Sequence, residues 1–226
     1  MDFYLEWEKN LHDIEKNKEY INQFLSKTEN SLKVFNTGTT DELVYVCKFL
    51  LELPINNFIY CINENIECTT DAIIQYSNLE HAIVDVPRVL KFQNGPLTFS
   101  ELGKIIIKAK EDGACKKYGE NHAKVAYEMS MVNFERKSSI VVANNSFGNF
   151  SVGLSNNDRI ELVKRLALRN EFIQKLIYLA KNGLVNYMDI ACEILSESTA
   201  IRRKPNVRQL VNLILKDTEI INNIVW

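Results

Sequence analysis

Hydrophobic residues recur at helical spacing through the last third of the chain. The clearest run covers residues 171–180, and Lys181 and Gly183 follow it. A cation in the last turn and a glycine just beyond it are the usual end of a helix. A second apolar run at residues 188–195 predicts another short helix, after which Ser196 is placed to cap a third. The pattern predicts three helices, with a tight polar turn before the last.

The third predicted helix is basic on one side and apolar on the other. Its apolar side includes Ile201, Val207 and Leu210. Pro205 removes one helical hydrogen bond and clashes with the preceding turn, so it either kinks this helix or starts a separate one. The sequence leaves both interpretations open. Residues 218–226 alternate enough to form a terminal strand, which would make this unit a winged helix-turn-helix.

The N-terminal part of the chain is predicted to be mostly helical. Residues 2–26 carry apolar side chains at near-helical spacing, which is typical of a long helix packed against a core. A helix that is apolar nearly all round is expected at residues 42–53, before Pro54. The further predictions are a loop around 36–40, a strand or a helix at 55–66, a short helix at 71–79 and an extended segment at 80–92 that breaks at Pro87.

The middle of the chain begins with the Gly-Pro punctuation of a boundary at residues 93–98, and we place a domain border near residue 94. Residues 139–154 are predicted to form the clearest β-hairpin, with two β-rich runs around Asn145 and Gly148. The other expected elements are helices at 101–110, 120–132 and 156–170, and a loop at 111–119.

Together these patterns predict a mainly α protein. Helix, helix, hairpin is the order of a winged helix, so we expect tandem winged-helix-like (helix-turn-helix) units with one clear β-hairpin, plus a helical N-terminal region. Two stretches, 99–154 and 171–226, share the order helix, helix, strand, although no residue-level match between them is evident. The expected domains are an acidic, mostly helical domain at 1–93, a winged-helix-like unit at 94–156 and a C-terminal helix-turn-helix unit at 157–226.

Charge is distributed unevenly along the 226 residues. Residues 1–98 hold 8 Lys and Arg against 15 Asp and Glu, whereas the rest is mildly basic and the whole chain has a net charge of −2. An acidic first part and a basic second part fit a protein whose second part meets a polyanion. The chain is nevertheless less basic than a dedicated DNA-binding domain usually is.

Cysteine usage and hydropathy favour a cytoplasmic protein. The five cysteines are scattered, odd in number and without a CxxC pair, so reduced and mostly buried thiols are expected. No apolar run approaches the roughly 18 residues needed to span a bilayer. The first ten residues, MDFYLEWEKN, are acidic and do not have the basic-then-apolar pattern of a signal peptide.

The sequence carries no evident catalytic, metal or cofactor motif. It has no P-loop and no GxGxxG, and its three histidines are widely separated. A nuclease core needs carboxylates and a lysine that meet to hold a divalent metal, and Glu80, Asp85 and Lys91 do not have the expected Glu-x-Lys spacing. His81 is expected to be structural, and His122 has no serine, cysteine or acid placed by spacing to serve it. We therefore predict no catalytic residue, metal or cofactor.

DNA contact is the chemistry that the basic segments favour. Ser198 and Thr199, in the first turn of the third helix, can donate to phosphate or a base edge, and the helix N-terminus favours an anion. Arg202 and Arg203 follow one turn later, where a guanidinium can bridge phosphate oxygens or a guanine edge. The remaining predicted contacts are Lys204 and Arg208 on this helix, Lys116 and Lys117 in the loop, and Asn121, His122 and Lys124 on the outward side of the next helix. A merely solvated basic face is the plainer interpretation.

The run from GENHAKVAYEMSMV through LVKRLALRNEFIQKL to LSESTAIRRKPNVRQLVNLI resembles tandem helix-turn-helix regions that accompany bacterial type II restriction endonucleases and related defence proteins. The second unit of those regions carries a SxSTxxRR…vr pattern, which is matched by Ser196, Ser198, Thr199, Arg202, Arg203, Val207 and Arg208. The first unit departs from the pattern, because residues 129–132 (MSMV) stand in place of an LGL-like stop. The resemblance covers about residues 97–216 and implies recognition of duplex DNA, with the nuclease in a separate domain.

These observations predict a sequence-specific duplex DNA-binding protein, or the DNA-recognition subunit of a restriction or phage-defence system. Its expected partners are double-stranded DNA and a nuclease or other defence protein, with no membrane, and a homodimer stays open. Two alternatives remain. One is a protein–protein adaptor on a winged-helix scaffold, and the other is a small type II restriction endonuclease with a metal site that the sequence does not reveal.

Overall fold

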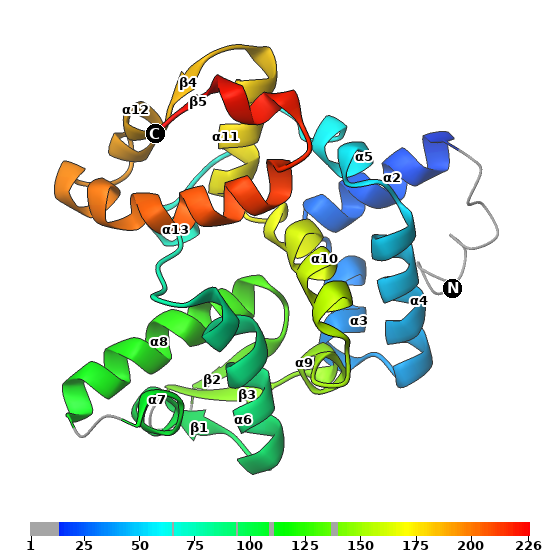
Figure 1. The fold of residues 1–226 in the computed structure, drawn as a ribbon. Helices are drawn as coiled ribbons and strands as arrows, with labels where there is room; N and C mark the ends of the chain where they lie inside the picture. The colour runs from blue at the N-terminus through cyan, green and yellow to red at the C-terminus, as the bar shows by residue number, and fades with distance from the viewer. Residues whose placement is uncertain (1–13, 65, 94, 109–110, 137–139) are drawn as a thin grey trace.

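The computed structural model describes residues 14–64, 66–93, 95–108, 111–136 and 140–226. Helices dominate these residues, as predicted, together with one three-stranded and one two-stranded sheet (Figure 1). One cluster of buried hydrophobic side chains includes residues from Tyr20 to Ile224. Helix α10 (Asn156–Ala167) runs through the middle of the molecule, between the N-terminal helices and two further helical groups (Figure 1).

The N-terminal group contains the helices α2 (Ile14–Leu25), α3 (Glu29–Thr37), α4 (Thr40–Glu52) and α5 (Ile55–Tyr60). Residues 2–13 of the helix predicted at 2–26 lie outside the described residues. Helix α4 confirms the helix predicted at 42–53. It starts at Thr39, whose side chain accepts from the amide of Glu42 while the Glu42 carboxylate accepts from the amide of Thr39.

The predictions of a short helix at 71–79 and an extended segment at 80–92 are wrong. A 3-10 turn, η1 (Thr70–Ala72), forms in place of the predicted short helix, and the segment predicted as extended is helical, with a π turn, η2 (His81–Asp85), leading into α6 (Val86–Gln93). Pro87, which has no N–H to donate, lies directly after this π turn, inside a helical stretch that is continuous over residues 79–93. The amide of Val86 just before it donates five residues back, to His81.

The first helical unit, which we define as residues 86–144, has helices on one three-stranded sheet. In chain order its elements are α6, β1 (Leu97–Thr98), α7 (Phe99–Ile107), α8 (Asp112–Glu128), β2 (Val132–Arg136) and β3 (Ile140–Asn144). Strand β3 lies in the middle, antiparallel to both neighbours, so the order is β1-β3-β2. Helix α6 packs against α7, α8 and β3, although it precedes the border predicted near residue 94.

Helix α8 begins earlier than predicted, because it includes most of the expected loop at 111–119. Gly119 lies inside the helix where α7 and α8 cross closely. A Cβ at Gly119 would lie 2.0 Å from the carbonyl oxygen of Phe99, and one at Gly103 would lie 1.9 Å from that of Cys115. The glycine that suggested a loop is therefore required by helix packing.

The predicted hairpin at 139–154 is misplaced. The hairpin is formed by β2 and β3, and the second predicted run begins as a helix, α9 (Ser146–Ser151). Asn145 caps this helix, because its side-chain oxygen accepts from the amide of Gly148 at 2.8 Å. A Cβ at Gly148 would lie 1.9 Å from the carbonyl oxygen of Met131. A cap and a close packing contact thus explain the residues that were interpreted as a turn.

The second helical unit, residues 171–226, contains the three predicted helices. Its elements are α11 (Glu171–Asn182), β4 (Val185–Asn186), α12 (Tyr187–Cys192), α13 (Glu197–Leu215), η3 (Glu219–Asn223) and β5 (Ile224–Val225). The predicted terminal strand is limited to β5, which pairs in parallel with β4. Pro205 lies on the exposed side of α13, and the helix continues past it, so the interpretation with a separate helix is excluded.

The two units share a local plan that is visible residue by residue. Each has a two-residue strand, a side-chain N-cap, a buried aromatic residue at the first helical position, an acid at the third, and then a buried aliphatic and a buried small residue. In the first unit these are Leu97, Thr98, Phe99, Glu101, Leu102 and Gly103, and 88 positions later they are Val185, Asn186, Tyr187, Asp189, Ile190 and Ala191.

Candidate nucleic-acid interface

Helix α8 carries its basic residues on an exposed stripe. Its inner side is buried, as at Gly119 and Ala123, whereas Lys116, Lys117 and Lys124 are exposed. Lys124 forms an ion pair with Glu120, on the same helix, at 2.8 Å. Lys116 and Lys117 have no ion-pair partner among the described residues. The two lysines predicted on a loop therefore lie on the surface of a helix with their charges available.

Helix α13 exposes a second set of basic residues. Its inner side is buried through Ala200, Val207, Leu210, Val211, Ile214 and Leu215. Arg202 and Arg208 are exposed and Lys204 is half-buried. Arg202 and Lys204 have no ion-pair partner in the described parts of the chain, and the guanidinium of Arg208 lies 5.9 Å from the ring centroid of Trp226. Three of the predicted arginine and lysine contacts thus remain accessible.

The start of α13 is polar and lacks a side-chain cap. Ser196 is the N-cap residue, but its hydroxyl donates to Thr199 Oγ1 at 3.0 Å and lies 3.4 Å from Ser198 Oγ. Ser198 is exposed and Thr199 is half-buried. Because no side chain accepts from the first-turn amides, the positive end of the helix dipole is open there.

Arg203 is not directed outward like Arg202. Its Nη1 donates to the carbonyl oxygens of Thr70 (3.0 Å) and Ile73 (2.5 Å). Burial lowers the pKa of Arg203, and the neighbouring charge of Arg202 lowers it further. In this structure the guanidinium predicted to contact DNA holds another part of the chain.

His122 was predicted on the outward side of α8, and this is wrong, because only 1% of the residue is exposed. Since a backbone amide can only donate, the 3.4 Å contact from Asn78 N–H makes Nε2 the acceptor. Nδ1 then carries the proton and donates to the carbonyl of Tyr118 at 2.8 Å. Ser77 Oγ is also 3.4 Å from Nε2. Burial lowers the pKa of His122 below its ordinary value of 6.5.

Arg203 and His122 hold the same stretch of chain, residues 70–78, which we call the bridge segment. It is tied to α13 a second time, because Tyr76 and Asn206 exchange two hydrogen bonds. The Tyr76 hydroxyl donates to the Asn206 carbonyl at 2.9 Å, and the Asn206 side-chain amide donates to the Tyr76 carbonyl at 2.6 Å. Asn170, the N-cap of α11, donates to the carbonyl of Ala72 at 2.8 Å.

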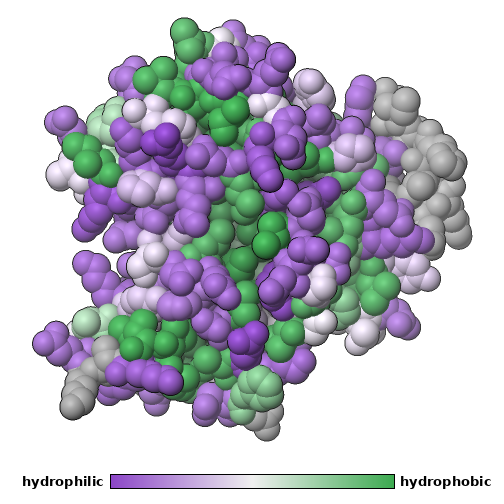
Figure 2. Space-filling model, viewed as in Figure 1, coloured by the Kyte–Doolittle hydropathy of each residue, from purple (hydrophilic) through white to green (hydrophobic). Residues whose placement is uncertain are grey.

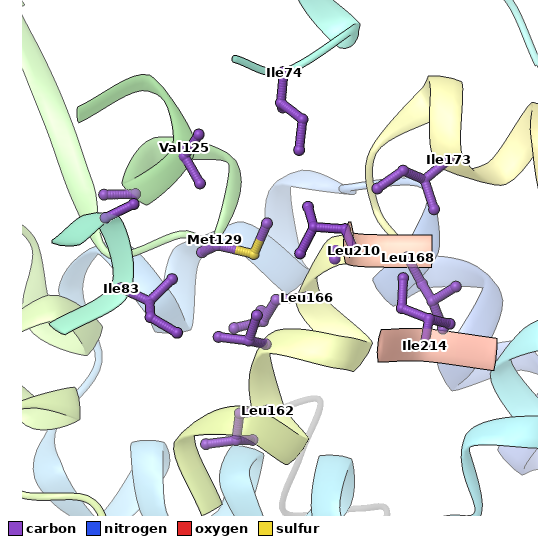
Figure 3. Packing of buried hydrophobic residues seen from close by; sticks show 14 of the residues in the cluster. Ile74, Ile83, Val125, Met129, Leu162, Leu166, Leu168, Ile173, Leu210 and Ile214 are labelled. Atoms are coloured by element: carbon purple, nitrogen blue, oxygen red, sulfur yellow. The ribbon is translucent and has the colours of Figure 1, made fainter. Parts of the chain in front are cut away.

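The bridge segment also contributes to the hydrophobic core. Ile74 is 5% exposed and points toward the same cluster as Val125 of α8 and Leu210 of α13 (Figure 3). Leu166 of α10 lies in that cluster as well (Figure 3). Polar and apolar contacts of the bridge segment therefore join the two helical units to each other.

Three predicted DNA contacts, Asn121, Lys124 and Arg203, line one cavity of about 200 Å³ between the units. The outline of the molecule is indented where α8 and α13 face each other, and mostly hydrophilic residues surround the indentation (Figure 2). Tyr127 also lines the cavity; it is half-exposed and stacks on Phe134, with ring centroids 5.0 Å apart. The structure brings these contacts together but keeps Lys116, Lys117 and Arg208 outside the cavity.

A second hollow, of about 510 Å³, lies between η2, α10 and α13 and is mainly apolar. Ile160 is 40% exposed beside it, and hydrophobic residues are visible at the centre of the face in Figure 2. Buried Arg159 lines one side and donates to Asn156 Oδ1 and to the carbonyls of Ser151 and Leu154. None of the residues predicted to contact DNA lines this hollow.

The residues considered for a nuclease site do not converge in the structure. Lys91 donates to the carbonyl of Asn149 at 3.0 Å, and Asp85 lies 3.6 Å from Arg88. Nδ1 of His81 forms a hydrogen bond with the Tyr118 hydroxyl. In the part of the chain that the structure describes, no group of three His, Cys, Asp or Glu could hold a metal ion.

The five cysteines are free, and burial raises the pKa of Cys47 to about 12. Cys115 is also buried, whereas Cys192 is exposed. No helix within the described ranges is both long enough and apolar enough to cross a membrane.

No protein-family model, no curated protein and no solved structure matches the chain. The resemblance to helix-turn-helix regions of restriction and defence proteins therefore stays a prediction.

Several residues that shape this surface were missed by sequence reasoning. Tyr76 and Asn206 are 130 positions apart, and no local pattern connects them. Tyr127 was predicted only as part of a helix and Phe134 was assigned to no element, although their stacked rings line the cavity. The exposure of Ile201, at 56%, beside Arg202 was equally unexpected, because it was assigned to the apolar side.

Proposed function

We propose that the protein recognises duplex DNA through two winged-helix-like units, with α8 and α13 as the helices that face the duplex. The observation that carries the proposal is the local plan repeated 88 positions apart, in which a strand and a capped helix precede α8 and α13 alike. In the first unit, a helix-strand-helix-helix order is followed by two strands, with β3 between β1 and β2. A helix pair followed by such a hairpin is the arrangement of a winged helix.

The chemistry of the exposed surfaces supports DNA as the partner. Arg202 and Lys204 on α13, and Lys116 and Lys117 on α8, carry charges that no acid neutralises within the described residues. Phosphate contacts of this kind supply most of the sequence-independent affinity for DNA. Ile201, exposed beside Arg202, would offer an apolar contact to a thymine methyl group, while Arg202 can bond a guanine edge.

The polar start of α13 supports a phosphate contact at Ser198 and Thr199, because hydroxyls and open first-turn amides both favour an anion. Arg208 lies two turns further along the exposed surface and would contact the phosphate backbone. Asn121 and Lys124 would extend the interface along α8. Arg203 and His122 would act indirectly, by holding the bridge segment.

We also propose a role in restriction or phage defence, with a nuclease supplied by a partner. This part rests on the resemblance of residues 97–216 and on the match at Ser198, Thr199 and the two arginines after them. The partner would supply the nuclease site, because the sequence of this chain has no evident nuclease motif.

The test is a salt titration of duplex binding by the wild type, Arg202→Ala and the double variant Lys116→Ala/Lys117→Ala. Removal of one phosphate contact should reduce the slope of log affinity against log salt by about 0.9. Removal of a base contact at Arg202 should also cost about 1–3 kcal/mol and relax specificity at one position. The control is Lys33→Ala on α3, an exposed lysine far from both helices in sequence, which should leave slope and affinity unchanged.

If all four proteins bind duplex weakly, without sequence preference and with the same slope, the adaptor alternative is favoured. The observation on its side is the apolar hollow between η2, α10 and α13, whose exposed Ile160 would suit a protein partner. Replacing Ile160 with Asp should then abolish partner capture and leave DNA binding as it was. The DNA proposal instead expects Arg202→Ala and Lys116→Ala/Lys117→Ala to change the salt dependence of duplex binding, and Ile160→Asp to leave it unchanged.

A further inference from the structure

We propose that α8 and α13 read two segments of one duplex at a single fixed spacing, because the bridge segment locks the two helices together. The inference rests on the proposed DNA function and goes beyond it, since it specifies the kind of site that the protein would select. The bridge segment, residues 70–78, is the part of the structure that carries it.

The bridge segment is attached to α13 at two neighbouring turns. Arg203 donates to the carbonyls of Thr70 and Ile73, and the reciprocal pair of Asn206 and Tyr76 follows one turn later. Hydrogen bonds at both ends fix the direction of the segment as well as its distance from the helix. A single contact would leave the segment free to rotate, and two do not.

The opposite side of the bridge segment is attached to the first unit. Nε2 of the buried His122, on α8, accepts from the amide of Asn78, and Ile74 packs in the same cluster as Val125 of α8 (Figure 3). Glu128, at the end of α8, forms an ion pair with Lys27, which also pairs with Glu171 at the start of α11. Both units are therefore joined through the bridge segment and, independently, through Lys27.

The spacing between the two helices is short as well as fixed. Lys124 of α8 and Arg203 of α13 line the same cavity of about 200 Å³, so the side chains of the two helices are within a few ångströms of a common space. Helices that face successive turns of DNA are about 34–36 Å apart. We infer that the two DNA segments are neighbours within about one helical turn.

A rigid pair of helices is sensitive to the length of DNA between its two segments. Each inserted base pair moves one segment along the axis and also turns it by about 34°. Five inserted base pairs place it on the opposite side of the duplex, where the second helix cannot follow. Flexibly linked units would instead tolerate the insertion.

The first experiment selects sites from a pool of random 30-base-pair duplexes with the full chain. The expected result is a motif of two short blocks, less than about one turn apart, at one constant spacing. One block alone, or two blocks at varied spacings, overturns the fixed-spacing inference while leaving DNA recognition standing. A pool that shows no enrichment overturns the proposed function and this inference with it.

The second experiment measures affinity for the selected duplex and for a copy with five base pairs inserted between the blocks. The wild type should bind the second duplex about 100-fold or more weakly, because one recognised block is then out of reach. Tyr76→Phe, which removes one hydroxyl and keeps the ring, and Arg203→Gln should narrow that ratio at least several-fold. Arg202→Gln, its matched neighbour, removes a contact to one block, so it should weaken binding to the selected duplex without strengthening binding to the duplex with the insertion.

Circular dichroism and thermal melting identify any variant that fails to fold, and Tyr76→Phe is the conservative choice if Arg203→Gln does. The inference is overturned if both bridge variants keep the wild-type ratio, or if Arg202→Gln strengthens binding to the duplex with the insertion as much as they do. It is supported if that binding is strengthened only when bonds to the bridge segment are removed.

Discussion

The two helical units follow the same local plan but make their central helix crossing by different means. In the first unit, α7 and α8 approach so closely that Gly103 and Gly119 have no room for a Cβ. In the second unit, Ala191 takes the position of Gly103, and the aromatic residue Tyr187 donates its hydroxyl to the carbonyl of Ala200 on α13 at 3.0 Å. The first crossing is made by contact of backbones, and the second by a buried hydrogen bond.

This difference shows that a shared pattern of strand, cap and buried residues determines the order of the helices and strands. It does not determine how closely the helices approach each other. Phe99 and Tyr187 occupy equivalent positions and differ by one hydroxyl, which in Tyr187 bonds to α13. The sheets differ as well, because β3 is paired on both sides and β5 pairs only with β4 among the described strands. We expect the first unit to tolerate changes at its crossing less well.

The largest loss of stability is expected when Gly103 of the first unit is replaced by alanine, the residue that the second unit has at the equivalent position 191. Gly103→Ala places a Cβ 1.9 Å from the carbonyl oxygen of Cys115, and backbone cannot move aside cheaply. We expect a loss of about 3 kcal/mol or more in the free energy of unfolding, at or above the usual range for overpacking. Urea denaturation measures it. Gly113→Ala, in the first turn of α8 with open space around it, should instead be neutral or stabilising; equal losses in both would contradict the packing argument.

The second largest loss of stability is expected for Arg203, which bonds to the bridge segment, in comparison with its exposed neighbour Arg202. Arg203→Ala removes charged hydrogen bonds to two carbonyls and should cost about 1.5–3 kcal/mol. Arg202→Ala should change stability by less than about 0.5 kcal/mol, as for most surface substitutions. Thermal unfolding of both variants in the same buffer is the measurement. If Arg203→Ala lost no more stability than Arg202→Ala, the hydrogen bonds of Arg203 to the bridge segment would not be stabilising.

A smaller loss of stability is expected when Tyr187 of the second unit is replaced by phenylalanine, the residue that the first unit has at the equivalent position 99. Tyr187→Phe keeps the ring and removes the hydroxyl, so the buried carbonyl of Ala200 loses this donor. The expected loss is about 1–2 kcal/mol in the free energy of unfolding. The reverse change, Phe99→Tyr, finds no equivalent partner at the glycine crossing and should not stabilise. A neutral Tyr187→Phe would mean that packing alone holds α13.

The smallest effect is a pH dependence that only the first unit has, because residues 171–226 contain no histidine. The pKa of His122 is lowered in the folded protein, so below pH 6.5 the unfolded chain takes up a proton that the native protein does not. Stability should therefore fall as the pH drops from 7.5 through 6.5 toward 5.5.

The measurement for His122 is the slope of unfolding free energy against pH for the wild type and His122→Gln. The variant should be less stable at pH 7.5 but have the shallower slope, because it lacks the group that titrates. His81, whose ring centroid lies 6.0 Å from that of His122, is present in both proteins. Parallel slopes would contradict the assignment to His122.

The helical class and most helices after residue 155 could be predicted, because amphipathic spacing and capping residues are local signals. The errors came from residues with two uses. Gly119 was interpreted as a loop signal and serves a helix crossing, and Asn145 was interpreted as a turn and serves as a cap. Pro87 suggested a broken extended segment and instead lies within a helical stretch, directly after a π turn. Each ambiguity is resolved only by a neighbour far away in sequence.

The same limit applies to the candidate interface. Spacing correctly identified the exposed residues Lys124, Arg202 and Arg208, because exposure follows the helical period. Lys116 and Lys117 are exposed too, but they were predicted on a loop and lie on a helix. Spacing also placed Arg203 and His122 among the exposed residues, although both face the bridge segment. A residue at the border of the apolar side can point to solvent or to a packed loop, and helical spacing is identical in the two cases.

The bond between Tyr76 and Asn206 has a consequence for synthesis of the chain. Asn206 lies 130 positions after Tyr76, so this length of chain must be made before the bridge segment meets its partner. At ~5–20 residues per second, this takes roughly 7–26 s on the ribosome. Throughout that interval the first unit can form its own crossing and sheet, while residues 70–78 keep water on the groups that α13 will later bind. A nascent chain released before residue 206 would lack the contact between Tyr76 and Asn206. The backbone of the bridge segment would then be exposed to proteases and chaperones.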